Sequence, residues 1–490
     1  MLGKLEYKWI VGIVFVFGLF MDLLDMTIVN VAIPQLALEF NTDTTTIQWV
    51  VTGYLLSLAV FIPVSGWLGD RFGTKRIFMT ALFLFTSASL LCGLSWNIES
   101  LITFRVLQGV GGGMLTPVGT AMLFRAFPPH ERAKGAAILT IPMVVAPASG
   151  PVLGGYLVEF HSWREIFFIN VPIGIAAFAF AAIALREEKQ HEAGSLDVPG
   201  FILGCSGLAS LVYALSEAGS SGFDDPQVMM FGVTGLILLA AFTIVELRVA
   251  EPMIDIRLFK NRLFAATNTV QIVGQGGLMG ALFLLPLLLQ AEMGMSPLES
   301  GLTTFPQAIG VVTMIQVAGR IYPRIGPRRM MMAGMAGASL TTAAFLLVGL
   351  ETSAWWIRLI MYFRGASFSL VLVSLQTATF ATISPRDMGR ASALYNSGRQ
   401  VAASFGVAVL ASVLENRLAH HGTQLGPPPI GNPEAALNAF HEAFAVASAL
   451  TIVGILACFL VNDKEAAVSM QRAPAGAPLE GEEPAPAAIP

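Results

Sequence analysis

Two carboxylates stand inside the first apolar run of the chain. Asp22 and Asp25 lie near the middle of a run from Trp9 to about Ile33, which is long enough to cross a bilayer as one helix. Because they are three residues apart, they share one face of that helix. An ionised aspartate at bilayer depth costs roughly 2.5–3.5 kcal/mol. We therefore expect these groups to bind protons or ions, or to be paired inside the protein.

The fourth apolar run, at about 99–123, holds a charge that could match them. Its stretch LITFRVLQGVGGG, from Leu101 to Gly113, carries Arg105. An arginine at membrane depth must be paired or must face a water-filled cavity. The glycines could indicate a nucleotide-binding loop, but no lysine follows them and the run lies in a membrane helix, so we reject that interpretation. A purely structural bond from Arg105 to an aspartate remains an alternative to a functional one.

The composition places the whole chain in the membrane. Of its 490 residues, 55% are hydrophobic and only 12% are charged, whereas ordinary globular chains carry about 25% charged residues. Cys92, Cys205 and Cys458 stand far apart within apolar runs, so we interpret them as small hydrophobic side chains rather than as a disulfide or metal set. No small-residue cleavage site precedes the first run, which we therefore expect to remain as the first helix.

The apolar runs predict fourteen membrane-spanning helices. They lie at about 9–33, 47–68, 77–95, 99–123, 136–158, 165–185, 198–217, 227–247, 264–290, 300–319, 330–350, 354–380, 392–414 and 440–462. If the N-terminus is cytoplasmic, all but six of the 28 lysines and arginines fall in cytoplasmic segments. Such a bias predicts an even number of spans with both termini in the cytoplasm, and thus a multi-pass protein of the inner (plasma) membrane.

The chain contains an internal repeat. The stretch GWLGDRFGTKR, Gly66–Arg76, follows the second run, and GRIYPRIGPRR, Gly319–Arg329, follows the tenth. Six runs, a pair and six related runs predict two parallel halves with an inserted helical hairpin, which is transporter architecture. The expected units are an N-terminal six-helix bundle (1–185), a linker with two extra membrane helices (186–262), a C-terminal six-helix bundle (263–462) and a disordered cytoplasmic tail (463–490).

Two motifs add physical detail to this outline. In Gly66–Arg76 the glycines allow a tight turn and a close helix approach, while Asp70 can accept hydrogen bonds from a helix end or from arginines of a neighbouring span. An ordinary positively charged inner loop is the alternative, but the glycines, the aspartate and the three basic residues in this arrangement, echoed in the second half, argue against it. In the fifth run, Ile141–Gly155, prolines kink the helix and glycines let a neighbour approach closely. Membrane helices rich in glycine and proline are common, so this second pattern alone decides little.

Taken together, these stretches resemble the major facilitator superfamily, in its 14-helix drug:proton antiporter branch of EmrB/QacA-like exporters. The resemblance rests on Leu24–Pro34, Gly66–Arg76, Leu101–Gly113 and Ile141–Gly155, and it covers residues from about 9 to 462. It implies an all-α polytopic membrane protein with the major facilitator fold, in which two six-helix bundles flank two extra helices.

The resemblance also implies roles for two groups of residues. An inner gate would be formed by Gly66, Asp70, Arg71, Gly73 and Arg76. An antiporter motif, which favours export over uptake, would be formed by Pro147, Gly150, Pro151, Gly154 and Gly155. The second copy of the gate loop has Pro323 where the first has Asp70, so no acidic gate role is carried over to it.

The two carboxylates of the first helix become unequal under this resemblance. Asp25 occupies the acidic position of the branch, and the family places its first and fourth helices side by side, which makes Arg105 the partner of Asp25. Burial raises the pKa of a carboxyl group and a nearby arginine lowers it, so Asp25 could load and unload a proton; a permanent ion pair is the alternative. Asp22 lies one turn earlier, and it either assists with protons or a cationic substrate or simply reaches towards water in the cavity.

Several polar side chains are candidates for lining a substrate cavity, although most such residues in membrane helices only pack or bond to neighbours. They are Asn30, Gln48, Trp49, Gln108, Gln275, Gln307 and Gln376. We find no catalytic set, no metal-ligand spacing and no phosphate-binding loop, so we expect neither an enzyme nor a cofactor, nor any nucleic-acid partner. The expected partners are protons, a small-molecule substrate and the lipid bilayer, and we expect a monomer.

The function that this pattern favours is proton-coupled export, an antiport, of small lipophilic or cationic compounds such as drugs by alternating access. An exporter of a specific metabolite, lipid or siderophore, or an uptake symporter, would use the same scaffold. A membrane sensor without transport activity, or a membrane-embedded enzyme, is the alternative from another class, and the lack of any long soluble segment or catalytic cluster weighs against it.

Overall fold

The structure, a computed structural model, describes residues 6–40, 44–188, 197–249, 255–423 and 432–470, and all regular structure within them is helical. The apolar runs form helices because a chain in lipid must satisfy its backbone hydrogen bonds internally. The first seven are α1 (Tyr7–Glu39), α2 (Thr44–Phe72), α3 (Thr74–Gly93), α4 (Ile98–Ala126), α5 (Arg132–Phe160), α6 (Glu165–Phe168) and α7 (Asn170–Ala184). The others are α8 (Val198–Ser221), α9 (Pro226–Arg248), α10 (Arg262–Leu287), α11 (Pro297–Thr304), α12 (Pro306–Ile325), α13 (Pro327–Ala343), α14 (Ala354–Thr379), α15 (Met388–His420), α16 (Pro433–Ala457) and α17 (Ala467–Met470), with the 3-10 turn η2 (Pro129–Glu131) before α5.

Twelve helical segments of the described residues are long and apolar enough to cross a membrane. They confirm an all-α polytopic membrane protein but not the predicted count of fourteen spans. The two predicted spans outside this group are α4 and α5, with 29 residues each, or about 44 Å of helix. Glycines and Arg105 lower the hydropathy of α4.

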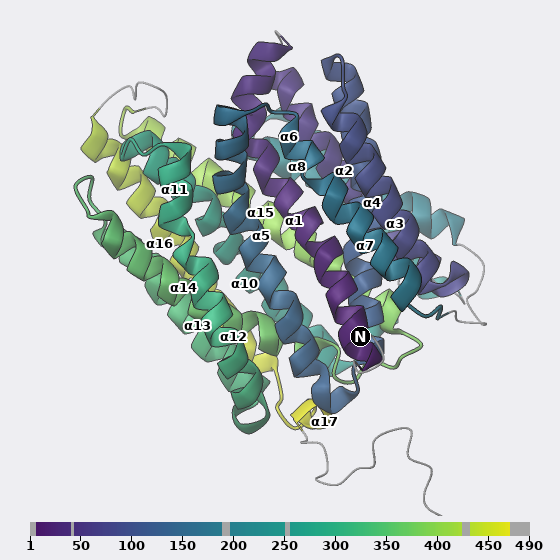
Figure 1. Cartoon of the computed structure of the whole chain (residues 1–490). Coiled ribbons are helices and arrows are strands. Elements are labelled where there is room, and N and C mark those ends of the chain that lie inside the picture. Colours follow the sequence, from purple (N-terminus) through teal and green to yellow (C-terminus); the bar gives the residue numbers. More distant parts are fainter. Residues whose placement is uncertain (1–5, 41–43, 189–196, 250–254, 424–431, 471–490) are drawn as a thin grey trace, which may run out of the picture.

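The long helices gather into two groups, which Figure 1 shows side by side, α1–α7 in purple to blue and α10–α16 in teal to yellow-green. In the first group α4 packs against α2 and α3, and α1 packs against α5. In the second group α14 packs against α12 and α13, and α10 packs against α15. The same pairings at corresponding positions are what a repeated unit predicts, while the predicted unit limits at 185, 262 and 462 stay a prediction.

Two helices carry most of the contact between the groups. Helix α5 packs against α11, α12 and α14 of the second group, and α15 packs against α2 and α4 of the first. In the repeat, α5 and α15 are equivalent helices, so the junction has approximate symmetry. Any movement of one group against the other must therefore change the contacts that α5 and α15 make.

The inserted pair, α8 and α9, lies beside that junction. Helix α8 packs against both α2 and α15. The Cys205 thiol donates to the carbonyl of Val60 over 3.0 Å, and the Ser412 hydroxyl donates to the carbonyl of Ala218 over 3.2 Å. The hairpin thus touches both groups, as an element inserted between two halves can.

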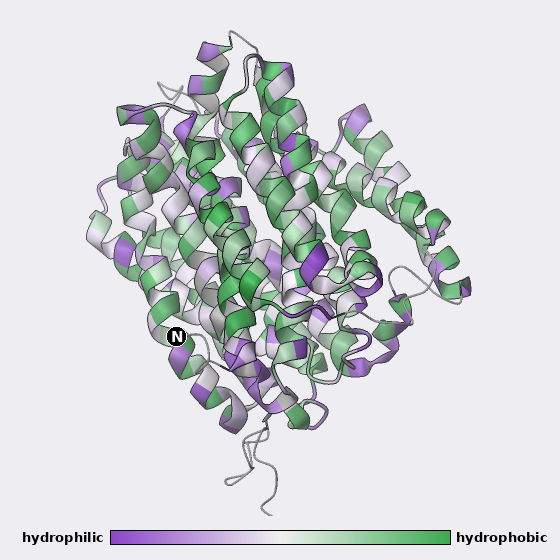
Figure 2. Ribbon diagram, turned by 45° about the vertical axis from the view of Figure 1, so that its right-hand side comes forward, coloured by the Kyte–Doolittle hydropathy of each residue, from purple (hydrophilic) through white to green (hydrophobic). Residues whose placement is uncertain are grey.

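The outer surface of the helices is apolar. In Figure 2 green, hydrophobic positions cover much of the outward-facing ribbon. On α9 the large exposed side chains include Met229, Val233, Leu236, Ile237 and Ile244. Apolar surface of this extent is stable only when it is covered, and in a bundle with these spans lipid covers it.

The end of the chain differs from the predicted disordered tail. Residues 463–466 and α17 are described, and α17 contacts both α12 and η2. The Ser469 side chain is buried and its hydroxyl lies 2.9 Å from that of Tyr322. Residues 471–490 of the predicted tail lie outside the described residues.

Candidate functional site

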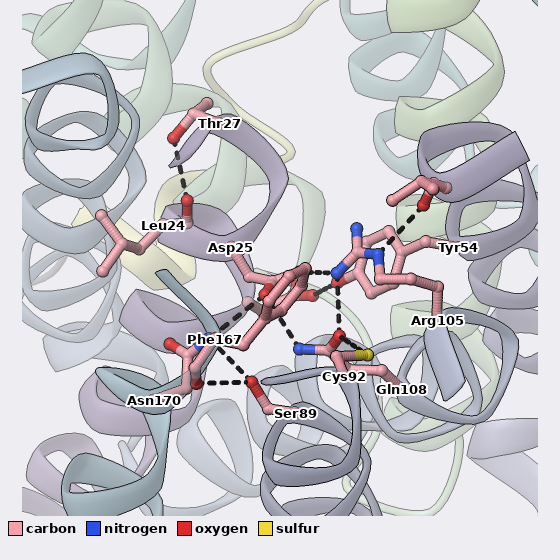
Figure 3. Close-up of polar contacts among 12 residues, drawn as sticks. Leu24, Asp25, Thr27, Tyr54, Ser89, Cys92, Arg105, Gln108, Phe167 and Asn170 are labelled. Atoms are coloured by element: carbon pink, nitrogen blue, oxygen red, sulfur yellow. Dashed lines mark hydrogen bonds and ion pairs between the residues drawn. The ribbon is translucent and has the colours of Figure 1, made fainter. Parts of the chain in front are cut away.

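Helices α1 and α4 bring the predicted carboxylate and arginine together in the interior of the first group. Arg105 donates through Nη1 to Asp25 Oδ2, and Figure 3 shows the two side chains facing each other. The exposed fractions of the two side chains are 1% and 0%. The Nε of Arg105 also donates to the carbonyl of Val50, 3.0 Å away on α2. The pairing of Asp25 with Arg105 that the resemblance implied is present in the structure.

The second oxygen of Asp25 is held by two amides. Gln108 Nε2 donates to Oδ1 over 2.9 Å, and Asn170 Nδ2 donates to the same oxygen over 3.1 Å. Gln108 in turn accepts from Arg105 Nη1 over 2.8 Å, and Asn170 also donates to Ser89 Oγ over 3.2 Å. The pair therefore sits inside a closed network that ties α1 to α3, α4 and α7 (Figure 3).

Aromatic rings complete the surroundings of Arg105. Its guanidinium carbon lies 4.2 Å from the centre of the Tyr54 ring and 5.9 Å from that of Phe167. A ring face attracts a cation, and the attraction grows when water is excluded. The cost of burying Arg105 is thus offset by one carboxylate, two neutral oxygens and two rings.

Asp22 lies one turn away in a different setting. The Tyr54 hydroxyl donates to Asp22 Oδ1, and the Thr116 hydroxyl donates to Oδ2 over 3.1 Å. Asp22 is 3% exposed, and within the described residues no basic side chain pairs directly with it. Gly112 makes room for this group, because a Cβ there would lie 2.8 Å from Asp22 Oδ1.

The predicted gate loop lies where the two groups meet. Asp70 forms a largely buried ion pair with Arg125, with 2.6 Å between Oδ1 and Nη2, and Arg125 also donates to the carbonyl of Pro385 in the second group over 3.0 Å. At Gly66 a Cβ would lie 2.6 Å from the carbonyl oxygen of Gly389, so only glycine allows this approach.

The other predicted gate residues, Arg71, Gly73 and Arg76, lie at the turn between α2 and α3. Gly73 has φ 102°, a conformation that favours glycine, and it ends α2 before α3 begins. The carboxylate of Glu187 accepts from the backbone N–H groups of Lys75 and Arg76 over 3.1 and 3.2 Å, which caps the start of α3. The Arg71 side chain is exposed.

The motif predicted for antiport lies on α5 beside the carboxylates. A Cβ at Gly150 would collide with the side chain of Thr27, two residues after Asp25 on α1. The next residue, Pro151, lies against Gly301 of α11. Pro147 is half-buried within the helix, and the two following glycines of the motif, at 154 and 155, are buried. Helix α5 therefore connects the site on α1 with the second group.

The candidates for a substrate cavity lie on several helices of both groups. Gln108 belongs to the Asp25 network, while Trp49 stacks on Tyr213 of the inserted α8 with ring centres 6.2 Å apart. Gln376 is buried and donates to the sulfur of Met143 over 3.3 Å. Gln307 is buried and Gln275 is half-buried. The side chains of Asn30 and Gln48 lie outside the described residues.

Sequence reasoning missed several partners. Asn170, Tyr54 and Thr116 were not among the predicted site residues, because their sequence signal was only that of polar side chains in membrane helices. The spacing of Arg105 and Gln108, three residues apart on one helix face, could have identified the amide as a second ligand of Asp25. The donation of Arg132 to the carbonyl of Phe380, between the two groups, had no signal at all.

Comparison with known proteins places this geometry in a family. A family profile described as Major Facilitator Superfamily matches residues 15–407. The chain is 35% identical over 431 residues to the uncharacterized MFS-type transporter YhcA of Bacillus subtilis, covering 88% of this chain and 81% of that protein. It is 36% identical over 403 residues to the multidrug resistance protein B homolog of Mycobacterium tuberculosis, covering 81% and 74% of the two chains.

Two further likenesses extend the comparison. The chain is 34% identical over 422 residues to the putative multidrug resistance protein MdtD of Serratia proteamaculans, covering 86% of this chain and 87% of that one. Among solved structures, the crystal structure of the human organic anion transporter MFSD10 (TETRAN) superimposes with a TM-score of 0.64, covering 92% of this chain and 99% of that one. At 16% sequence identity, this last likeness shows the fold alone.

Proposed function

Because the chain belongs to the major facilitator superfamily, we propose that this secondary transporter exports small lipophilic or cationic compounds, such as drugs, in exchange for protons. It is a multi-pass membrane protein and not an enzyme. Relatives named multidrug resistance proteins support the class of substrate. The proposed path is alternating access between the two helix groups.

One observation carries the coupling to protons. Two carboxylates and one arginine, Asp22, Asp25 and Arg105, are almost fully buried within the first group. Charged groups at membrane depth are costly and typically mark proton or ion pathways. A carboxylate reached from one side of the membrane at a time can take up a proton on the outside, where substrate leaves, and give it up on the inside, where substrate enters.

The contacts between the groups indicate which side is closed. The Asp70–Arg125 pair, its link to Pro385 and the contact of Gly66 with Gly389 all lie at the same end of the bundle. The excess of lysine and arginine in these loops supports a cytoplasmic location for that end. We therefore assign the structure to a state closed towards the cytoplasm, and opening would require these contacts to break.

The remaining features of the proposal concern topology. Helices α4 and α5 cross the membrane together with the twelve apolar segments, which makes fourteen spans with both termini in the cytoplasm. The protein would then lie in the inner membrane as a monomer with two six-helix bundles, 1–185 and 263–462, joined by the linker 186–262. Cysteine labelling from each side of the membrane at loops between spans tests this topology.

The test of function is transport in everted membrane vesicles loaded with a pH indicator dye. Adding ethidium or tetraphenylphosphonium to energised vesicles should release protons from the lumen only when the transporter is present. Acidification of the lumen by substrate would indicate symport instead. Absence of any gradient-dependent flux, with these cations and with neutral antibiotics, would refute the proposal and favour a specific metabolite, lipid or siderophore as the substrate.

A further inference from the structure

The two buried carboxylates are bound by donors of different chemistry. Within the described residues, each hydrogen bond to Asp25 comes from a nitrogen, those of Arg105, Gln108 and Asn170. Guanidinium and amide N–H groups donate but do not accept, and arginine keeps its proton in proteins. A proton added to either oxygen of Asp25 would therefore face an N–H group, which cannot accept it as a hydrogen bond. The donors around Asp25 therefore match a carboxylate without a proton.

Asp22 is bound by hydroxyl groups. Tyr54 donates to one oxygen and Thr116 to the other. A hydroxyl group can donate or accept, and it changes role by rotating about one bond. A protonated Asp22 could donate to either hydroxyl without moving a helix. The same partners therefore satisfy Asp22 in both of its protonation states.

The charges around Asp22 come from both helix groups. On its own helix lies Asp25, on α4 lies Arg105, which pairs with Asp25, and on α2 lies Tyr54. From the second group, Arg399 of α15 lies near enough for its positive charge to act on Asp22, although no direct ion pair joins the two within the described residues. Helix α5 carries no charged residue from 135 to 158, and α7 carries none at all.

Helix α15 is also in contact with α4 beside this site. The Ser392 hydroxyl donates to the carbonyl of Pro117 over 2.8 Å, one residue after Thr116. Arg399 lies two helical turns further along α15. The position of Arg399 relative to Asp22 therefore depends on how closely the two groups approach.

We propose that Asp22 is the group that carries the transported proton. Asp25 and Arg105 form a permanent pair that positions α1, and Arg399 is attracted to Asp22 across the interface only while Asp22 is ionised. This assignment rests on the proposed function and reverses the roles that the sequence favoured. A proton from water on one side binds the Asp22 carboxylate, and the same proton leaves to water on the other side, with no covalent bond between heavy atoms changed. Ionised Asp22 attracts Arg399 and draws the groups together, and protonation removes that attraction.

Infrared difference spectroscopy of the full-length protein in liposomes tests the assignment without any substrate. A protonated carboxylic acid has a C=O stretching band that a carboxylate lacks. We expect wild-type protein to gain such a band on acidification, Asp22→Asn to lose that component, and Asp25→Asn to retain it. A component retained in Asp22→Asn, or lost only in Asp25→Asn, would overturn the assignment.

Two further variants guard against misfolding and test Arg399. Asp22→Glu should restore the infrared component, shifted in the pH at which it appears, whereas a purely structural Asp22 would give no titrating band to restore. Arg399→Gln should shift the midpoint of the same component to higher pH because a positive charge that favours the carboxylate is gone. An unchanged midpoint would remove Arg399 from the proposal.

The outcome is separable from that of the transport experiment. If everted vesicles show no proton release with any substrate while the band still follows Asp22, proton-coupled export fails and the assignment of the titrating group stands as a property of the site. If proton release occurs and Asp22→Asn supports it at the wild-type level, export stands and Asp22 is not the carrier.

Discussion

The buried Asp25–Arg105 pair allows a quantitative test of its structural role. We consider Arg105→Met, Asp25→Leu and the double variant. Removing one partner of a buried pair leaves the other charge uncompensated, at a cost of about 3–5 kcal/mol. Arg105→Met should lie at the upper end, since it also gives up the bond to the Val50 carbonyl and the contact with the Tyr54 ring, the latter worth about 0.5–2 kcal/mol.

The double variant separates the energy of the Asp25–Arg105 interaction from the cost of losing each side chain. Replacing both charges with apolar side chains of similar volume is often neutral or stabilising. The double variant should therefore lose no more stability than either single variant, which corresponds to a coupling energy of at least about 3 kcal/mol. Unfolding in mixed micelles with increasing sodium dodecyl sulfate, followed by tryptophan fluorescence, measures these differences.

A surface pair of the same chemistry provides the control. Arg417 and Glu442 lie 2.8 Å apart with side chains 46% and 41% exposed, and such pairs contribute about 0.2–1 kcal/mol. The double cycle Arg417→Met and Glu442→Leu should show a correspondingly small coupling. If the effects of Arg105→Met and Asp25→Leu simply add, the two side chains do not act as a pair and the reasoning fails.

Three other predictions follow from the contacts of the helices. Gly66→Val should prevent the close approach to the Gly389 carbonyl. Cysteines introduced at the cytoplasmic end should then stay accessible to labelling, and export should fall at least tenfold. Labelling at the wild-type level would contradict this prediction. Gly150→Val should push α5 from α1 at a cost of about 1–3 kcal/mol, measured by the same unfolding assay, whereas the open position Gly155→Ala should cost little. Glu131 is partly buried, which by itself raises its pKa, but bonds from two lysines bring the pKa below the ordinary value. The contribution of Glu131 to stability is thus present above the ordinary carboxyl pKa and is lost as the pH falls through the lowered value. Glu131→Gln should remove this loss of stability at low pH.

Much of the fold follows from local properties of the sequence. Apolar runs must become helices in lipid, so the helical class and most helix positions could be predicted without tertiary contacts. The exception is the number of spans, because α4 combines the length of a span with glycines and an arginine. The glycines and the arginine lower the mean hydropathy of this helix, although its polar groups are buried against neighbouring helices.

The candidate site was predictable in part because a buried charge requires a partner. Arg105 and Asp25, 80 residues apart in the chain, could be paired by charge and by the resemblance. Gly66 and Asp70 could be assigned to a close approach in the same way. Their counterparts, Gly389 and Arg125, could not be identified from the sequence because neither stands out from other glycines and inner arginines.

The order of residues alone predicts an apolar repeated chain with two carboxylates in its first helix and an arginine in its fourth. Which donors bind each carboxylate follows only from how the helices pack. The rotation of α1 directs Asp25 towards the nitrogens of α4 and α7, and Asp22 towards the hydroxyls of Tyr54 and Thr116. A spacing of three residues sets both carboxylates on one helix face, but their donors come from other helices, and only packing brings those helices together.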